Sequence, residues 1–267
     1  MWGRQCQSLV ICHWSLVIGH SGLIRHSDFG FRISPASFQL QDTLRSIISP
    51  RVSTDGAEYS RRETDAGFRI LKGMAGIYRR AFHRTRLVRP CRLPRTGPAI
   101  LVCNHVSSID PILLQSFSPR LVRWMMAKEY YDYKSMRWLY ETMGVILVQR
   151  SGRDLAATRG AMRVLASGYV LGVFPEGRLE TTRDLIPFQS GIGLLAVKTR
   201  APVYPAFVDG TQRNREMVEA VVTPSVVSIA FGPPVDFADL TDSRAGALEA
   251  TRRIQAAVEA LKSGSKI

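Results

Sequence analysis

Short apolar runs alternate with longer amphipathic stretches from about residue 98 to the end of the chain. Such runs between polar, Gly or Pro residues are typical of buried strands, and apolar residues at every third or fourth position are typical of helices. The pattern predicts strands at 98–103, 121–126, 145–148, 169–174, 202–208 and 226–231. It predicts helices at 110–116, 133–142, 154–167, 190–199 and 244–262. This alternation predicts an α/β fold with a mixed, largely parallel sheet covered by helices on both faces.

Before this region, residues 66–90 are predicted to contain a basic amphipathic helix, with helical periodicity from Gly67 to about Arg84. One stripe is apolar and contains Phe68, Leu71, Met74, Ala75, Tyr78, Ala81 and Phe82. The residues largely off that stripe are Arg69, Lys72, Arg79, Arg80 and His83. A helix of this composition is suited to the interface of an anionic bilayer. The alternative is a helix that packs on the domain and leaves its basic face in solvent.

Residues 1–65 differ from the rest of the chain and are predicted to be a poorly ordered leader and linker. The segment Ser8–Trp14 is nearly repeated as Ser15–Ser21, with a weaker echo at Ser21–His26, and three of the five histidines fall in this array. Clustered histidines suggest a metal site, but no carboxylate or thiolate completes one, so a low-complexity leader is the preferred interpretation. The α/β domain itself is predicted to span residues 91–267.

The formal net charge of +14 indicates a polyanionic partner, either nucleic acid or an anionic membrane surface. Much of the excess lies in one block, because residues 66–109 contain no Asp or Glu. The cations of this block are Arg69, Lys72, Arg79, Arg80, Arg84, Arg86, Arg89, Arg92 and Arg95. No Walker loop or RNA-recognition aromatic pattern accompanies them, which disfavours nucleic acid.

The cysteines do not form a metal or disulfide pattern. Cys6, Cys12, Cys91 and Cys103 include no C-x-x-C pair and no histidine at zinc-ligand spacing. This predicts a reducing compartment and no metal. No apolar run in the sequence reaches the ~20 residues that a spanning helix needs.

The most informative stretch runs from Asn104 to Asp110, between the predicted strand 98–103 and the predicted helix 110–116. His105 at the end of a buried strand can take a proton, and Asp110, five residues further on, can reach back to hold its ring. This is the base and orienting half of a catalytic triad without a protein nucleophile. Alternatively, Asp110 is an N-cap before Pro111, and His105 is a hydrogen-bonded core residue.

Two other strand ends carry polar groups. Gln149-Arg150 follows the predicted strand 145–148, and Phe174-Pro175-Glu176-Gly177-Arg178 begins at the end of strand 169–174. Two arginines at strand ends suit a phosphate, because the planar guanidinium matches its oxygens. Each segment also has a plain structural explanation: a surface charge for Arg150, and a tight turn for Pro-Glu-Gly.

Together these segments resemble the glycerolipid acyltransferases, most closely the 1-acylglycerol-3-phosphate O-acyltransferase (lysophosphatidic acid acyltransferase) family. The four matching blocks in chain order are Asn104–Asp110, Lys128–Arg150, Phe174–Arg178 and Ala201–Ala206. The resemblance covers roughly residues 66–232. Many family members read Glu-Gly-Thr-Arg in the third block, whereas Arg178 directly follows Gly177 here, so Arg178 or Arg183 takes the family's arginine role; Arg178 is preferred.

The resemblance implies that His105 and Asp110 are catalytic and that Asn104, Arg150, Glu176, Gly177 and Arg178 bind substrate. His105 would deprotonate the free hydroxyl of a lysophospholipid, which would attack the thioester of acyl-CoA or acyl-carrier-protein directly and give phosphatidic acid. Arg150, Glu176 and Arg178 would seat the glycerol phosphate, and backbone amides near Gly177 are candidate oxyanion donors. No Gly-x-Ser-x-Gly elbow supports a serine acyl-enzyme.

The resemblance also implies no metal or cofactor beyond the acyl donor as co-substrate. The expected partners are a lysophospholipid and an anionic membrane surface, at the cytoplasmic face of a membrane to which the protein is bound peripherally or monotopically. The alternatives are an acyltransferase for another lysophospholipid or an aminolipid, a thioesterase-like hydrolase, and a non-enzymatic protein that binds polyanions or membranes.

Overall fold

The computed structural model describes residues 66–131, 137–149, 154–180, 182, 184–213, 215 and 217–262. The predicted leader and linker at residues 1–65 lies outside this part of the chain, as do residues 132–136 within one predicted helix.

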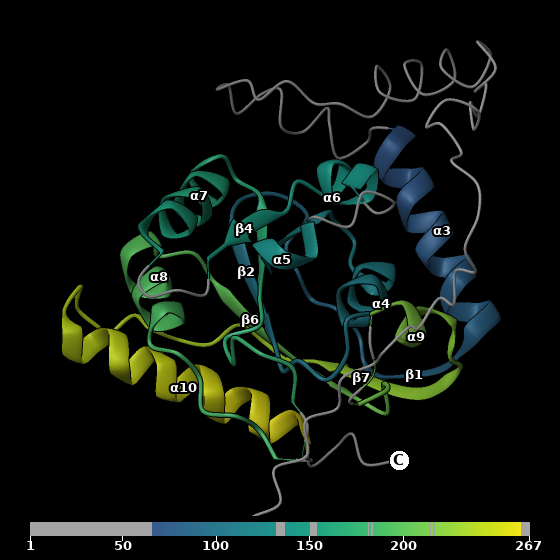
Figure 1. The fold of residues 1–267 in the computed structure, drawn as a ribbon. Coiled ribbons are helices and arrows are strands. Elements are labelled where there is room, and N and C mark those ends of the chain that lie inside the picture. The colour runs from purple at the N-terminus through teal and green to yellow at the C-terminus, as the bar shows by residue number, and fades with distance from the viewer. Residues whose placement is uncertain are drawn as a thin grey trace, which may run out of the picture. The chain divides into compact units, whose positions relative to one another are not determined.

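The described strands form one mixed sheet in the order β1-β7-β6-β2-β5-β3-β4 (Figure 1). They are β1 (His83–Arg89), β2 (Ala99–Cys103), β3 (Val122–Ala127), β4 (Ile146–Val148), β5 (Val170–Val173), β6 (Val203–Asp209) and β7 (Ser225–Phe231). All neighbours pair in parallel except β6 and β7, which are antiparallel. The strands from β6 to β4 in this order therefore end at one edge of the sheet, and ligands of α/β folds bind at that edge.

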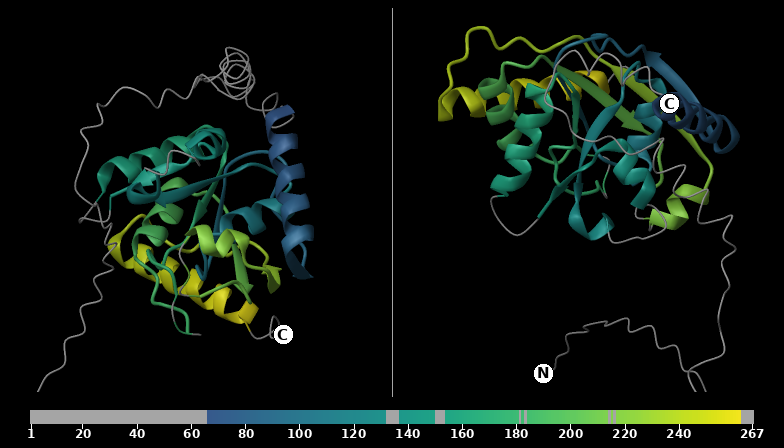
Figure 2. Two further views of the ribbon diagram at one scale, coloured as in Figure 1. Left: turned by 45° about the vertical axis from the view of Figure 1, so that its right-hand side comes forward. Right: turned by 90° about the horizontal axis from the view of Figure 1, so that it is seen from above.

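The described helices pack on both faces of the sheet. They are α3 (Ala66–Phe82), α4 (Asp110–Phe117), α5 (Lys128–Tyr131), α6 (Arg137–Met143), α7 (Leu155–Ala166), α8 (Gly191–Thr199), α9 (Met217–Val222) and α10 (Arg244–Lys262). Figure 1 shows α7, α8 and α10 on one side of the sheet and α3, α4 and α9 on the other, and the second panel of Figure 2 shows the same separation from above. The predicted fold class is confirmed.

Central strand β2 explains why the sheet has two covered faces. Its five residues are fully buried and alternate between two hydrophobic clusters. Leu101 packs in a cluster with Leu113 of α4, while Ile100 packs in a second cluster with Leu165 of α7 and Ile254 of α10. An uninterrupted apolar run is what a strand buried on both faces requires.

The six predicted strands and the helices α4, α7, α8 and α10 are confirmed to within two residues of their predicted bounds. Three described elements were not predicted: β1, α5 and α9. The helix predicted within residues 66–90 ends at Phe82, and His83–Arg89 is strand β1. This strand has few apolar residues, so its sequence gives no strand signal. Six parallel residue pairs with β7 fix its conformation, and its arginines protect an edge strand from further pairing.

Helix α3 carries apolar residues on two sides. Leu71 and Ala75 are buried against the domain, and the Tyr78 hydroxyl donates a hydrogen bond of 2.7 Å to the Val221 carbonyl. Ile70 and Ile77, in contrast, are 57% and 70% exposed. The prediction of a single lipid-facing stripe is therefore wrong in part. Leu71 and Ala75 face the protein, because a helix that packs against a domain buries one apolar side there. Among the described residues, no helix has the length and apolar character needed to cross a membrane.

Candidate active site

The site begins in the loop that leaves the carboxyl end of β2. The Nδ1 atom of His105 lies 3.2 Å from Oδ2 of Asp110, and the side chains are 20% and 0% exposed, respectively. A carboxylate beside Nδ1 favours the tautomer with its proton there, which leaves Nε2 with a lone pair. The structure thus brings together the two residues predicted to be catalytic.

The Asp110 carboxylate also shapes the loop itself. Its Oδ2 atom accepts hydrogen bonds from the backbone N–H groups of Val106 and Ser107, each at 2.7 Å. The N-cap of α4 is Ile109, so Asp110 is the first helical residue and its side chain folds back onto the loop. The alternative prediction that Asp110 is the N-cap residue of this helix is therefore wrong.

Asn104 is buried and its side-chain amide is used by the sheet. Its Nδ2 donates to the Val208 carbonyl at 2.9 Å, and its Oδ1 accepts the Val208 N–H at 2.8 Å. This paired bond extends the β2–β6 ladder by one side chain. Asn104 therefore anchors the loop where it leaves the sheet.

The Pro-Glu-Gly-Arg segment forms a turn after β5, the neighbour of β2. Gly177 has a φ of +70° and its N–H donates to the Phe174 carbonyl at 3.1 Å. A Cβ at this position would meet only the end of the exposed, flexible Gln189 side chain, so the positive φ is what favours glycine here. Because the Gly177 N–H is used within its own turn, it is not available as an oxyanion donor in this conformation.

This turn holds the backbone of His105 from both sides. The His105 N–H donates to Oε1 of Glu176 at 3.3 Å, and the Glu180 N–H donates to the His105 carbonyl at 2.7 Å. The two bonds fix the peptide groups before and after the His105 Cα. Glu176, predicted to bind substrate, is only 4% exposed and supports the loop that carries His105.

The local electrostatics favour a neutral Glu176. Desolvation raises the pKa of Glu176 to about 8, the His105 N–H bond opposes the rise, and the nearby Glu180 and Asp110 charges add to it. Burial also raises the pKa of Glu180, which the charge of Arg213 counteracts. Arg213 lies 3.6 Å from Glu180 and 3.0 Å from Asp209 at the end of β6. Sequence reasoning missed Arg213, because nothing local connects it with a carboxylate that is remote in the chain.

The cations predicted to hold a phosphate are only partly described. Arg178 is exposed at the turn after β5, whereas Arg150 and the alternative Arg183 lie outside the described residues. Gln149, just before Arg150, donates its N–H to Oδ2 of Asp154 at 2.7 Å, and Oδ1 of Asp154 accepts the Ala157 N–H at 2.9 Å. Asp154 is the N-cap of α7, so the chain that leads into Arg150 is tied to the start of that helix.

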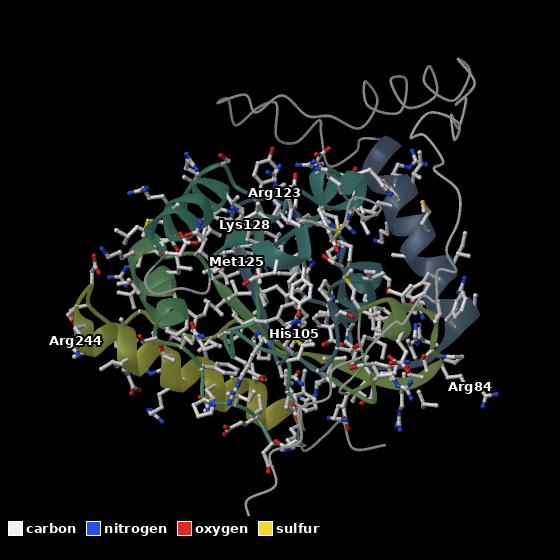
Figure 3. All side chains as sticks on the ribbon, in the orientation of Figure 1. Arg84, His105, Arg123, Met125, Lys128 and Arg244 are labelled. Carbon is white, nitrogen blue, oxygen red and sulfur yellow. The ribbon has the colours of Figure 1, made fainter. Side chains whose placement is uncertain are left out.

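Lys128 is a further cation at this edge that the predicted site residues did not include. It directly follows β3, is exposed, and lies in the same central region of Figure 3 as His105 and Met125. Arg244, by contrast, lies at the far end of α10 in that view. Two features of the sequence pointed to Lys128: it lies two residues after the predicted strand 121–126, and it begins the second block of the family resemblance.

No described group of three His, Cys, Asp or Glu side chains is arranged to hold a metal ion. The buried Cys103 thiol donates to Asn104 Oδ1 at 3.4 Å, and burial raises its pKa well above the ordinary value. A thiol in that state is a poor nucleophile. The functional groups of the described site are therefore the oriented imidazole, the carboxyl groups that support it and the cations at the edge of the sheet.

The comparison with protein families finds one match at this site: residues 84–209 match the family described as Acyltransferase, and this span contains His105, Asp110 and the turn after β5. Two relatives are named 1-acyl-sn-glycerol-3-phosphate acyltransferase. The protein from Cocos nucifera is 27% identical over 149 residues, which are 55% of this chain and 48% of the relative. The protein from Bacillus subtilis (strain 168) is 24% identical over 170 residues, which are 63% of this chain and 80% of the relative.

The match spans about half the length of the first curated relatives. A solved structure, the 1-acyl-sn-glycerophosphate (LPA) acyltransferase PlsC from Thermotoga maritima, has a TM-score of 0.61 and 22% identity. The similarity covers 85% of this chain and 89% of that one and shows a shared fold. The resemblance stated from the sequence is confirmed by these comparisons.

The raised pKa of Glu176 predicts a loss of stability with rising pH. The folded protein holds this proton up to about pH 8, whereas the unfolded chain releases it near the ordinary value of 4.5, so unfolding becomes easier as pH rises through this interval. Glu176→Gln keeps an oxygen for the His105 N–H and stays neutral at every pH. We expect melting temperatures measured from about pH 5 to 9 to fall less steeply in this variant than in the wild type.

Glu259→Gln on α10 removes an exposed carboxylate and is the control, since it should follow the wild-type curve. Parallel curves for wild type and Glu176→Gln would contradict the assignment of a neutral Glu176.

Proposed function

We propose that this protein transfers a fatty acyl group from acyl-CoA or acyl-carrier-protein to the free hydroxyl of 1-acylglycerol-3-phosphate, giving phosphatidic acid. The observation that supports this most is the His105 ring, held at Nδ1 by a buried carboxylate and partly exposed at the carboxyl edge of the sheet. The names of the relatives give the substrate class, and the arginine after β5 suits its phosphate.

In the proposed reaction, Nε2 of His105 takes the proton of the acceptor hydroxyl while the oxygen attacks the thioester carbonyl carbon. The tetrahedral intermediate then collapses, the C–S bond breaks, and the thiolate leaves and recovers the proton from the imidazolium. Asp110 stabilises the imidazolium that exists between these two steps. Direct attack needs no acyl-enzyme, which agrees with the inert state of the buried Cys103 thiol.

The first test is His105→Ala in an acyl-transfer assay with lysophosphatidic acid and a panel of acyl donors. Loss of a general base alone costs about 10²- to 10⁴-fold in rate, so turnover should fall by at least about 10²-fold while the melting temperature stays near that of the wild type. Asp110→Asn should also be severe, and it should be less stable, because the loop N–H groups then share a neutral acceptor.

Wild-type turnover by a folded His105→Ala protein would exclude this mechanism. Release of free fatty acid without consumption of the acceptor would favour the hydrolase alternative. Equal turnover with a lysophospholipid that lacks a phosphomonoester, or with an aminolipid, would favour the second candidate function, acylation of another acceptor.

The second test concerns the phosphate of the acceptor. We propose that Arg178 binds it, with Arg150 from the neighbouring loop. A charge-assisted hydrogen bond is worth roughly 1.5–3 kcal/mol, so Arg178→Ala should raise the KM for lysophosphatidic acid at least about tenfold and the KM for the acyl donor much less. Arg244→Ala changes an exposed arginine at the far end of α10 and should leave both constants unchanged (Figure 3).

Arg183→Ala tests whether Arg183, and not Arg178, binds the phosphate of the acceptor. If Arg183→Ala raises the KM for the acceptor and Arg178→Ala does not, Arg183 takes this role. Equal weakening of both substrates by Arg178→Ala would indicate a structural arginine.

We also propose that the protein works at the cytoplasmic face of a membrane, bound peripherally or monotopically through the outer side of α3. Lysophospholipid and product both reside in a bilayer, so the enzyme must reach its surface. The outer side of α3 combines exposed Ile70, Met74 and Ile77 with exposed Arg69 and Arg80. Arg79 belongs to the protein side, since its guanidinium donates to Thr85 and lies 4.4 Å from the centre of the Phe117 ring.

Vesicle sedimentation with the full chain tests this proposal. Ile70→Ser with Ile77→Ser should weaken binding to neutral and anionic vesicles alike, because insertion of apolar groups is not screened by salt. Arg69→Glu with Arg80→Glu should weaken binding to anionic vesicles only and remove most of its salt dependence, since each cation near the surface contributes ~1 kcal/mol.

The matched control is Leu248→Ser, because Leu248 is an exposed leucine on α10, 53% accessible, and should not matter for sedimentation. If the α3 variants sediment like the wild type on both kinds of vesicle, the helix is only a packing element of the domain.

A further inference from the structure

Three aromatic rings are stacked at the carboxyl edge of the sheet, and the catalytic imidazole is one of them. The His105 ring lies over Phe174 with 3.9 Å between ring centres and 14° between the ring planes. Phe174 in turn lies over Trp124 at 4.7 Å and 11°. The rings come from three segments: the loop after β2, the residue that follows β5, and strand β3.

The sequence makes room for this stack at Gly172. Trp124 is paired with Gly172 across β3 and β5, and a Cβ on Gly172 would lie only 2.6 Å from Cδ2 of the indole. Because position 172 has no side chain, the indole can lie flat across β5. Phe174 follows two residues later on the same side of the chain and stacks on the indole. A side chain at position 172 would collide with the indole and with Val122, so the indole could not keep this position.

Packing, rather than hydrogen bonding, keeps Trp124 in place. The side chain is 2% exposed, and its indole N–H has no hydrogen-bond partner in the described part of the chain. The indole N–H of a buried tryptophan usually finds a hydrogen-bond partner. Because this one has none among the described residues, the contacts that hold Trp124 are those of its ring face.

The stack supplies a constraint that Asp110 does not. A single hydrogen bond at Nδ1 fixes one point of the imidazole, but the ring still turns about that point, because χ2 of histidine has a broad minimum. A flat contact with Phe174 fixes the plane of the ring. The two contacts together determine the direction in which Nε2 points.

We propose that Phe174, backed by Trp124 over Gly172, is a positioning residue that fixes the plane of the His105 imidazole and thereby aims Nε2 at the acceptor hydroxyl. This inference rests on the proposed function of His105 as the general base. Small errors in the position of a catalytic group cost up to about 10²-fold in rate, so the stack should matter for turnover more than for binding.

The direct test is NMR of histidine-labelled full-length protein, with the His105 signals assigned from His105→Ala. Protons of a ring stacked on an aromatic face resonate at higher field than in solvent. Phe174→Leu should move the chemical shifts of the His105 ring toward solvent values. Phe174→Tyr keeps an aromatic ring and should keep these shifts near those of the wild type. Phe231→Leu is the matched control, because Phe231 is a core phenylalanine of β7, 2% exposed, and should leave the His105 signals unchanged.

Kinetics on the same variants separate positioning from general stability. Phe174→Leu should lower kcat by about tenfold or more and change the KM for lysophosphatidic acid by less than about threefold. Phe174→Tyr should recover most of this loss. Phe231→Leu should lower the melting temperature by a similar amount without the loss in kcat.

Variants behind Phe174 test whether the effect is transmitted through the stack. Trp124→Leu should lower kcat, and Trp124→Phe should recover most of it, since a phenyl ring still offers a flat face. Gly172→Ala should also lower kcat although it is remote from the substrate. The double variant Gly172→Ala with Phe174→Leu should have nearly the same kcat as Phe174→Leu alone, since both changes release the His105 ring.

The proposal is overturned if Phe174→Leu leaves the His105 signals in place, or if its loss appears in KM instead of kcat. Full turnover by Phe174→Leu while His105→Ala is inactive would overturn the positioning role alone. Full turnover by His105→Ala would overturn the proposed function, and with it the reason to position this ring.

Discussion

The fold of the site depends on one buried carboxylate, that of Asp110. Its Oδ2 accepts two loop N–H groups at 2.7 Å and faces His105 Nδ1 at 3.2 Å, so one oxygen closes the loop and orients the ring. Burying a carboxylate is unfavourable unless hydrogen bonds replace the lost water, and these three partners do so at Oδ2, whereas Oδ1 is buried without a hydrogen-bond partner in the described part of the chain. The spacing of His105 and Asp110 is therefore a requirement of the loop geometry as much as of the proposed catalysis. An aspartate one position away would no longer reach both the ring and the loop N–H groups.

A second carboxyl group nearby has a different environment and a different role. Glu176 is almost fully buried, so desolvation raises its pKa to about 8, and the bond of 3.3 Å from the His105 N–H offsets this rise only in part. An ionised Glu176 would repel the Asp110 carboxylate across a poorly solvated space, and a neutral Glu176 avoids this repulsion. The turn after β5 can thus support the His105 backbone closely, with Glu180 on the other side of the same residue.

Local patterns in the sequence predicted much of the fold and the centre of the site, but not the long-range partners. Each apolar run became a strand because burial on both faces demands it, and His105 and Asp110 are neighbours in the chain. Asn104 is 104 residues from Val208, Trp124 is 50 residues from Phe174, and no periodicity connects such pairs. Strand β1 was missed for the same reason, because its conformation is fixed by pairing with β7 and not by its own arginine-rich sequence. The bonds between the Asn104 side chain and Val208, by which Asn104 joins the loop to the sheet, are another such long-range contact.

The connection between α3 and the catalytic domain bears on how a surface-bound enzyme would present its site. Helix α3 runs directly into β1, whose first residue, His83, is buried and hydrogen-bonded through Nδ1 to Ser225 at 2.7 Å. Burial lowers the pKa of His83, so this joint stays neutral and well packed. The Tyr78 hydroxyl adds a bond to the segment before β7. Because these contacts leave no flexible tether between helix and sheet, an α3 that lies on a bilayer would hold the carboxyl edge of the sheet, and His105 with it, at one fixed height and tilt above the lipid.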